Sequence, residues 1–184
     1  MRRLLLLPFL CFLVVGCSLS DNIDLTEDID GSLFEEHNGT FNLTIDDETT
    51  TFDSDDFMTA GFNTGNPKGF LIHTNGPNVY PRPSFRIFIY DVDINDLVAG
   101  AAFSGEDELK MDYVLYNDEN ASSPSVYSAY TKDDVYLKIT EVNMETSTIS
   151  GTFNCTGLDT LDGWYAGGKT YAMEGDFKDV PFRK

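Results

Sequence analysis

Apolar and polar residues alternate with a period of two along most of the chain after residue 40. Such alternation places one face of a strand on a core and the other toward water. The clearest segments are residues 41–45, 85–90, 135–140, 149–155 and 171–177. Weaker segments of the same kind cover residues 49–52, 56–63, 69–74, 111–117 and 125–130. The pattern predicts about ten strands.

Turn-forming Asp, Asn, Gly and Pro residues separate these segments. Asp162-Gly163 lies between two apolar runs and is the strongest hairpin signal in the chain. Only residues 95–100 favour a helix, of little more than one turn. Together the elements predict an all-β fold, a single antiparallel β-sandwich or flattened barrel over residues 37–184.

Two of the predicted strands carry aromatic residues on both faces. Tyr113 and Tyr116 fall on opposite faces of one strand, and Phe88 and Tyr90 fall opposite Phe85 in another. Two interpretations remain open. Such a strand is covered on both sides, or one face is an exposed aromatic platform that stacks on sugars or on a partner protein.

The N-terminus has the features of a secretory signal. Arg2 and Arg3 precede an apolar run over residues 4–15, and Gly16 stands directly before Cys17. The run is about 12 residues long, too short to cross about 30 Å of hydrocarbon as a helix. The segment resembles a bacterial lipoprotein signal, which implies a signal peptide at residues 1–16 and lipid attachment at Cys17. The alternative is an ordinary secretory signal in which Cys17 is incidental.

Residues 17–36 are predicted to be the lipidated cysteine and a flexible acidic tether, because residues 18–36 contain seven acidic residues and no basic one. The acidic stretch also resembles a surface-export signal of Bacteroidota lipoproteins, and a plain linker explains it equally well. The chain has a formal charge of -19, and loss of the two leader arginines makes it more negative. This charge argues against nucleic acid as a partner and against binding to anionic lipid headgroups, so the acyl chains must anchor the protein to the membrane.

Cysteine usage leaves Cys155 alone in the mature chain, because Cys11 lies in the leader and Cys17 carries lipid. A single cysteine in an exported protein is predicted to be a small buried hydrophobic residue. The alternative is a reactive thiol, for which His37 and His73 are the only histidines.

Acidic clusters provide the only candidate cofactor site. Asp91, Asp93 and Asp96 are candidates for calcium ligands, because calcium prefers carboxylate oxygens at such spacing. The segment is not an EF-hand, since its sixth and twelfth positions hold Asp96 and Ala102. Residues 53–56 form a similar cluster. No cofactor other than calcium is predicted, and the chain has no serine-hydrolase elbow and no set of zinc ligands.

The C-terminal third has a recognisable pattern. Residues 149–153 read Ile-Ser-Gly-Thr-Phe, and residues 174–177 read Glu-Gly-Asp-Phe. This pattern resembles the end of a domain family of unknown function found in small Bacteroidota lipoproteins. The resemblance implies that the first strand pairs into a final sheet and that the Gly-x-Phe strand completes it. Cys155 departs from the aromatic or aliphatic residue usual there, and the resemblance implies no reaction.

These observations predict a lipid-anchored protein of the bacterial outer membrane, facing the periplasm or the outside. Its expected role is binding or structural, without catalysis, and its ligand is a glycan or an envelope protein. Two alternatives remain open. One is a hydrolase whose carboxylates converge only in the fold, and the other is a calcium-dependent adhesion or assembly module.

Overall fold

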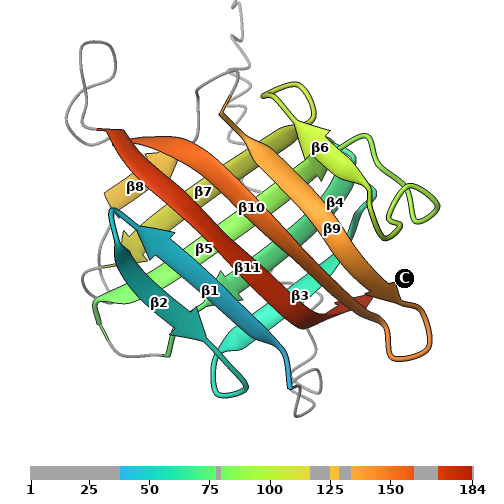
Figure 1. Cartoon of the computed structure of the whole chain (residues 1–184), viewed down its shortest axis with the longest axis horizontal. Coiled ribbons are helices and arrows are strands. Elements are labelled where there is room, and N and C mark those ends of the chain that lie inside the picture. Colours follow the sequence, from blue (N-terminus) through green and yellow to red (C-terminus); the bar gives the residue numbers. More distant parts are fainter. Residues whose placement is uncertain (1–37, 78–79, 117–124, 129–133, 160–169, 184) are drawn as a thin grey trace, which may run out of the picture. The chain divides into compact units, whose positions relative to one another are not determined.

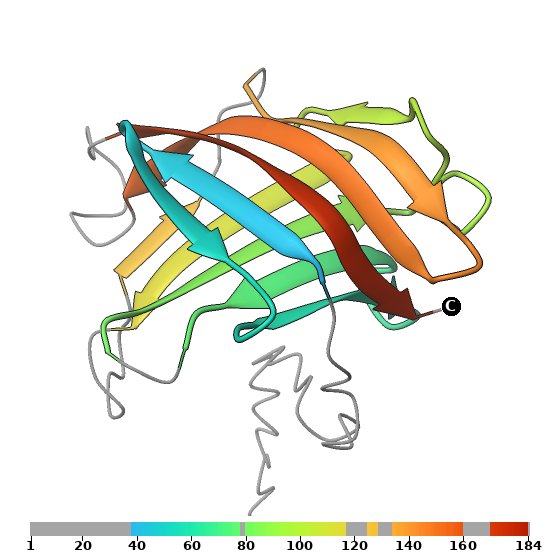
Figure 2. The ribbon, with the colours of Figure 1, turned by 60° about the horizontal axis from the view of Figure 1, so that its bottom comes forward.

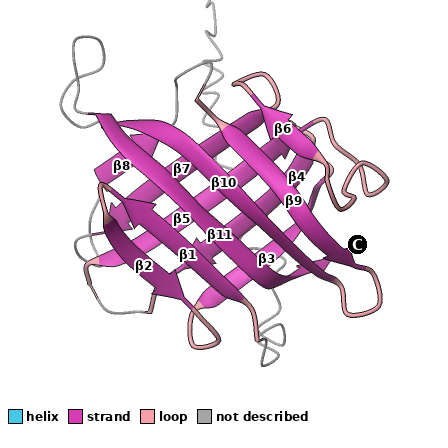
Figure 3. Cartoon of the chain, in the orientation of Figure 1, coloured by secondary structure: helices cyan, strands magenta, loops and turns pink. Residues whose placement is uncertain are grey.

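A computed structural model describes residues 38–77, 80–116, 125–128, 134–159 and 170–183. The predicted signal peptide, Cys17, the tether, His37 and the Asp162-Gly163 turn lie outside the described residues. The described part contains eleven strands and no helix, so the all-β prediction is confirmed (Figure 3). Accordingly, no helix that could cross a bilayer occurs in that part of the chain.

The strands form two layers that cross steeply in Figure 1. We call the six-stranded layer the front layer; its order is β2 (Glu48–Phe52), β1 (Thr40–Ile45), β11 (Thr170–Arg183), β10 (Thr148–Asp159), β9 (Tyr136–Asn143) and β6 (Ala102–Ser104). The back layer has the order β3 (Phe57–Asn63), β4 (Gly69–Asn75), β5 (Arg82–Tyr90), β7 (Leu109–Tyr116) and β8 (Ser125–Ser128).

Two short pairings connect the layers. At one edge β8 pairs with β10, and at the other the end of β11 pairs with β3. The β11–β3 pairing is parallel and includes Phe182 opposite Ala60. The sheet is therefore mixed, which corrects the expectation of a purely antiparallel fold. The physical reason is that β11 is long enough to run past its antiparallel partners and reach the back layer.

All ten strand segments predicted from the alternation form strands, and only the three-residue β6 was missed. The prediction of a helix at residues 95–100 is wrong. The chain makes turns there, and the Gly100 N–H donates to the Ile139 carbonyl on β9. Leu97 in this loop is buried against the core. Contact with the core and hydrogen bonding to β9 therefore replace the hydrogen bonds of a helical turn.

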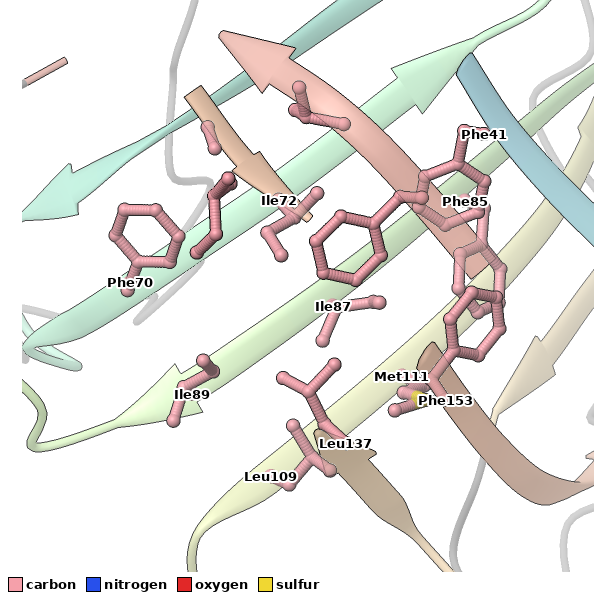
Figure 4. Close-up of a cluster of buried hydrophobic side chains, with 14 of the residues drawn as sticks. Phe41, Phe70, Ile72, Phe85, Ile87, Ile89, Leu109, Met111, Leu137 and Phe153 are labelled. Carbon is pink, nitrogen blue, oxygen red and sulfur yellow. The ribbon is translucent and has the colours of Figure 1, made fainter. Parts of the chain in front are cut away.

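The core lies between the layers and is rich in phenylalanine (Figure 4). The ring centroid of Phe41, from β1, lies 5.6 Å from that of Phe85 on the back layer and 5.3 Å from that of Phe153 on β10. Phe85 and Phe153 also stack, at 5.1 Å. Burying each such side chain contributes about 1.5–3 kcal/mol, so these contacts hold the two layers together.

The two Gly-x-Phe sequences singled out above pair with each other. Gly151 lies opposite Phe177, and Phe153 lies opposite Gly175, so each glycine faces the other strand's ring. A Cβ added at Gly151 would lie 2.5 Å from Phe177 Cζ, and one at Gly175 would lie 2.7 Å from Phe153 Cζ. The glycines therefore leave room for two rings that lie directly over the backbone of the neighbouring strand.

Candidate functional site

The predicted calcium ligands lie in a tight turn after β5. The Asp93 N–H donates to Asp96 Oδ2 at 2.9 Å, and the Asn95 N–H donates to Asp93 Oδ1 at 2.8 Å. Asp91, with a φ of 52°, donates its N–H to the Lys68 carbonyl. The carboxylates of Asp93 and Asp96 therefore hold the turn itself. A calcium site at these residues stays a prediction.

The second acidic cluster, at residues 53–56, forms the same turn. The Asp53 N–H donates to Asp56 Oδ2 at 3.1 Å, and the Asp55 N–H donates to Asp53 Oδ1 at 3.0 Å. Burial is the main cause that raises the pKa of Asp56, and the charges of Asp53 and Asp55 add to it. Both clusters thus share the pattern Asp-x-Asp/Asn-Asp, which stabilises a turn through its own side chains.

Cys155 lies on the inner face of β10 and is buried, which confirms the first of the two predictions for it. Burial raises the pKa of its thiol to about 12, and the charge of Asp112 contributes in the same direction. A thiol with this pKa is protonated at neutral pH, and the thiolate is the reactive form. The structure therefore does not support the alternative of a reactive cysteine.

A shallow hollow of about 450 Å³ lies over β9, β10 and β11. Its lining includes the carboxylates of Asp134 and Glu174, the amide of Asn154 and the ring of Tyr136, which is 40% exposed. Thr156 donates to Asp134 Oδ2 at 3.1 Å. The hollow brings together two acidic residues that are 40 positions apart in the sequence.

The outer face of the front layer otherwise consists mainly of small polar side chains. Neighbouring strands place Asn42, Thr51 and Asp176 on one row of this face. The Asn42 amide donates to both Asp176 carboxylate oxygens, at 3.3 and 3.2 Å, and the Thr51 hydroxyl donates to Asn42 Oδ1 at 2.9 Å. This face satisfies its own hydrogen bonds and offers few large side chains to a ligand.

The outer face of the back layer has a different composition. We call it the aromatic face and define it as the outward side chains of β3, β4, β5 and β7. Its larger members are Phe57, Leu71, His73, Arg82, Arg86, Phe88, Tyr90, Lys110, Asp112, Val114 and Tyr116. Among the described strands, none lies over this face, which forms the lower surface in Figure 2. Most of these side chains are half-buried by one another.

Rings and cations are interleaved on the aromatic face. The Arg82 guanidinium lies over the Tyr116 ring, 5.3 Å from its centroid. The rings of Phe88 and Tyr90 pack edge to face at 5.0 Å. These contacts hold the rings in place and leave the arginine on the outward side of the sheet.

A group of charged residues lies beside these rings. Lys110 Nζ lies 3.1 Å from Asp112 Oδ2, and Arg86 Nη2 lies 3.7 Å from the same oxygen. The Asp112 side chain is 12% exposed, whereas those of Arg86 and Lys110 are 43% and 42% exposed. One recessed carboxylate thus orients two cations whose outer parts face solvent.

His73 lies on the aromatic face, on β4, opposite Arg86. Its Nε2 lies 3.2 Å from the Ser84 hydroxyl, and its ring packs on Phe57. Burial, with a smaller contribution from the charge of Arg86, lowers the pKa of His73 to about 4. Ser84 is 3% exposed, so this serine–histidine pair is a buried hydrogen bond and not an accessible nucleophile.

Sequence reasoning located part of this site. Phe85 is buried in the core and Phe88 and Tyr90 point outward, as the alternation predicted. It missed the cations, Arg82, Arg86 and Lys110. The available signal was that residues 82, 86, 88 and 90 are separated by even numbers of positions along one strand, which puts all four side chains on one face.

Comparison of the chain with protein-family models, curated proteins and solved structures finds no match to any of them.

Proposed function

We propose that this protein is a lipid-anchored binding domain of the bacterial cell envelope that holds its ligand on the aromatic face. One observation carries the proposal. The two outer faces of the same sandwich differ, and only the back one concentrates large rings and cations. A sheet that only has to remain soluble favours polar outward residues, as on the front layer. Half-buried rings beside charged groups are typical of binding surfaces.

The proposed location rests on the N-terminal sequence. Arg2 and Arg3, the short apolar run and Gly16-Cys17 favour lipidation at Cys17 in the outer membrane. The resemblance of the C-terminal motifs to small Bacteroidota lipoproteins supports the same location. Mass spectrometry of the native protein should find an acylated N-terminal Cys17. An unmodified N-terminus at any other residue would contradict the proposed anchor.

A glycan array probed with the purified protein tests the binding role. The double variant Tyr90→Ser/Tyr116→Ser should lose at least about tenfold in affinity, the size of effect that removing interface rings commonly has. The matched control is Met144→Ser, which removes a large exposed side chain from the turn between β9 and β10 and should bind as the wild type does. Equal binding by the double variant, with an unchanged melting temperature, would argue against the aromatic face.

A second candidate function is favoured by the hollow on the front layer. Asp134 and Glu174 line it together with Tyr136, and paired carboxylates beside an aromatic ring are the groups that glycoside hydrolysis uses. Release of reducing ends from the bound glycan, abolished by Glu174→Gln and by Asp134→Asn, would support a hydrolase. Binding of the glycan without release of reducing ends would argue against a hydrolase and support the binding role only.

A further inference from the structure

We propose that the ligand of the aromatic face is an acidic polysaccharide, whose sugar rings pack on the aromatic side chains and whose carboxylates pair with Arg82, Arg86 and Lys110. The inference rests on the proposed binding function and names the class of ligand. It is drawn from the charge of this face, the exposure of its cations and the length of β5.

Charge is the first argument. The chain as a whole is strongly acidic, with 12 basic and 31 acidic residues. The aromatic face reverses this balance, because its outward positions hold three cations and only one carboxylate, Asp112. The described residues contain seven lysines and arginines, namely Lys68, Arg82, Arg86, Lys110, Lys138, Lys178 and Arg183. Three of the seven therefore gather on one face, where they provide a local attraction for an anion.

The arrangement around Asp112 leaves positive charge available. Arg86 and Lys110 both approach the same carboxylate oxygen, so one negative charge is shared between two positive ones. Both cations are more than 40% exposed, whereas the carboxylate is recessed. An incoming carboxylate can therefore reach both cations from the solvent side, where it competes with Asp112 for them.

The face also suits an extended ligand. Arg82, Arg86, Phe88 and Tyr90 follow one another on the outward side of β5, and these eight residue steps span about 27 Å at the rise of a strand. A linear chain lying along β5 would meet both rings and cations along its length, because β7 places Tyr116 beside Arg82 and Lys110 beside Phe88. The apolar C–H faces of sugar rings can pack on Phe88 and Tyr90, while their acidic groups reach the cations.

Two other classes of acidic partner fit less well. A peptide cannot add as a strand in the middle of this face, because β5 is already paired with both β4 and β7. A bilayer favours protruding apolar side chains, yet the exposed large hydrophobic residues in the described part of the chain are Val98, Tyr136 and Met144. All three lie away from the aromatic face.

The test measures binding of the purified full-length protein, in detergent, to polygalacturonate and to the same polymer after reduction of its carboxylates. Wild type should bind the acidic polymer, and binding should weaken as salt rises from 50 to 500 mM. Arg86→Gln/Lys110→Gln should lose about tenfold in affinity, since two exposed ion pairs are removed. The matched control, Lys138→Gln/Lys178→Gln, removes two lysines from the front layer and should change affinity less than about twofold.

A variant that is expected to bind more tightly separates the loss of a specific contact from misfolding, because misfolding can only weaken binding. Asp112→Asn removes the only carboxylate of the face and should tighten binding about twofold to fivefold. Weaker binding by Asp112→Asn, at an unchanged melting temperature, would overturn the inference.

The remaining outcomes separate the inference from the proposed function. Equal binding of the reduced polymer, still lost in Tyr90→Ser/Tyr116→Ser, would overturn the acidic ligand and keep the aromatic face as a binding site. Equal or tighter binding to poly-glutamate or to vesicles of anionic phospholipid would overturn the choice of a polysaccharide. Absence of binding to both polymers would also overturn the inference, and the glycan array would then decide on the proposed function alone.

Discussion

The two outer faces of this sandwich cover the same core and yet have opposite characters. The front face consists mainly of threonine, asparagine and acidic side chains, some of which hydrogen-bond to one another, as Asn42 and Asp176 do. The back face consists of rings, cations and one recessed carboxylate. Packing constrains only the inward positions, so both faces were free to be small and polar. The proposed binding role rests on this departure at the back face.

The largest expected effect concerns the front layer, where glycine makes room for a ring. Gly175→Ala should destabilise the protein by about 3 kcal/mol, because the new Cβ would collide with the Asn42 carbonyl oxygen and the Phe153 ring. Urea unfolding measures this loss. The control is Thr152→Ala, an outward position on β10, which should cost less than about 0.5 kcal/mol. A loss below about 1 kcal/mol for Gly175→Ala would show that the two strands can separate to accept a methyl group.

The next effect depends on pH and belongs to the back layer. The folded pKa of His73, about 4, lies below the usual 6.5 of the unfolded chain, so the unfolded state binds the proton more tightly. Stability is therefore complete above pH 6.5 and falls as the pH drops toward 4. Between pH 7 and pH 5 the loss from this one group should be about 2 kcal/mol.

Urea unfolding of wild type and His73→Gln at pH 7, 6 and 5 measures that loss. The variant should lose much less stability over this range than the wild type. Ser84→Ala keeps the buried imidazole and should retain the wild-type slope. A slope in His73→Gln as steep as in the wild type would assign the acid sensitivity to other groups.

A smaller effect of opposite sign is expected at the core side of the back layer. Thr74 is fully buried, and its hydroxyl has no hydrogen-bond partner among the described residues. Thr74→Val keeps the shape and removes the unsatisfied group, so it should stabilise the protein by about 1 kcal/mol. The melting temperature should rise. A fall would mean that the hydroxyl is hydrogen-bonded in solution.

The smallest effect compares the same substitution on the two outer faces. Asp112→Ala should cost roughly 0.5–1 kcal/mol, because it removes the recessed partner of Arg86 and Lys110. Asp176→Ala on the front face should cost less than about 0.5 kcal/mol, since Asn42 can hydrogen-bond to water instead. Chemical unfolding at low salt measures the difference. Equal costs would mean that the two faces differ in composition but not in how firmly their charges are held.

Strand positions followed from the sequence, but two local elements did not. Strand β6 has only three residues, too few for alternation to be recognised. Residues 95–100 have the composition of a helical turn, but the side chains of Asp93 and Asp96 hold the backbone in a different turn. Local hydrogen bonds and a buried Leu97 outweighed helix propensity there.

The sequence by itself determined the strands, the inward or outward direction of most side chains and the acidic charge, because alternation and composition are local properties. It also carried the N-terminal features on which the proposed anchor rests. The tertiary structure decided which outward residues become neighbours. Lys110 and Asp112 are neighbours on one face of β7, but Arg86 is 26 positions before Asp112, and only the antiparallel register of β5 and β7 brings Arg86 to that carboxylate. That register depends on packing of the whole core, which no single segment specifies.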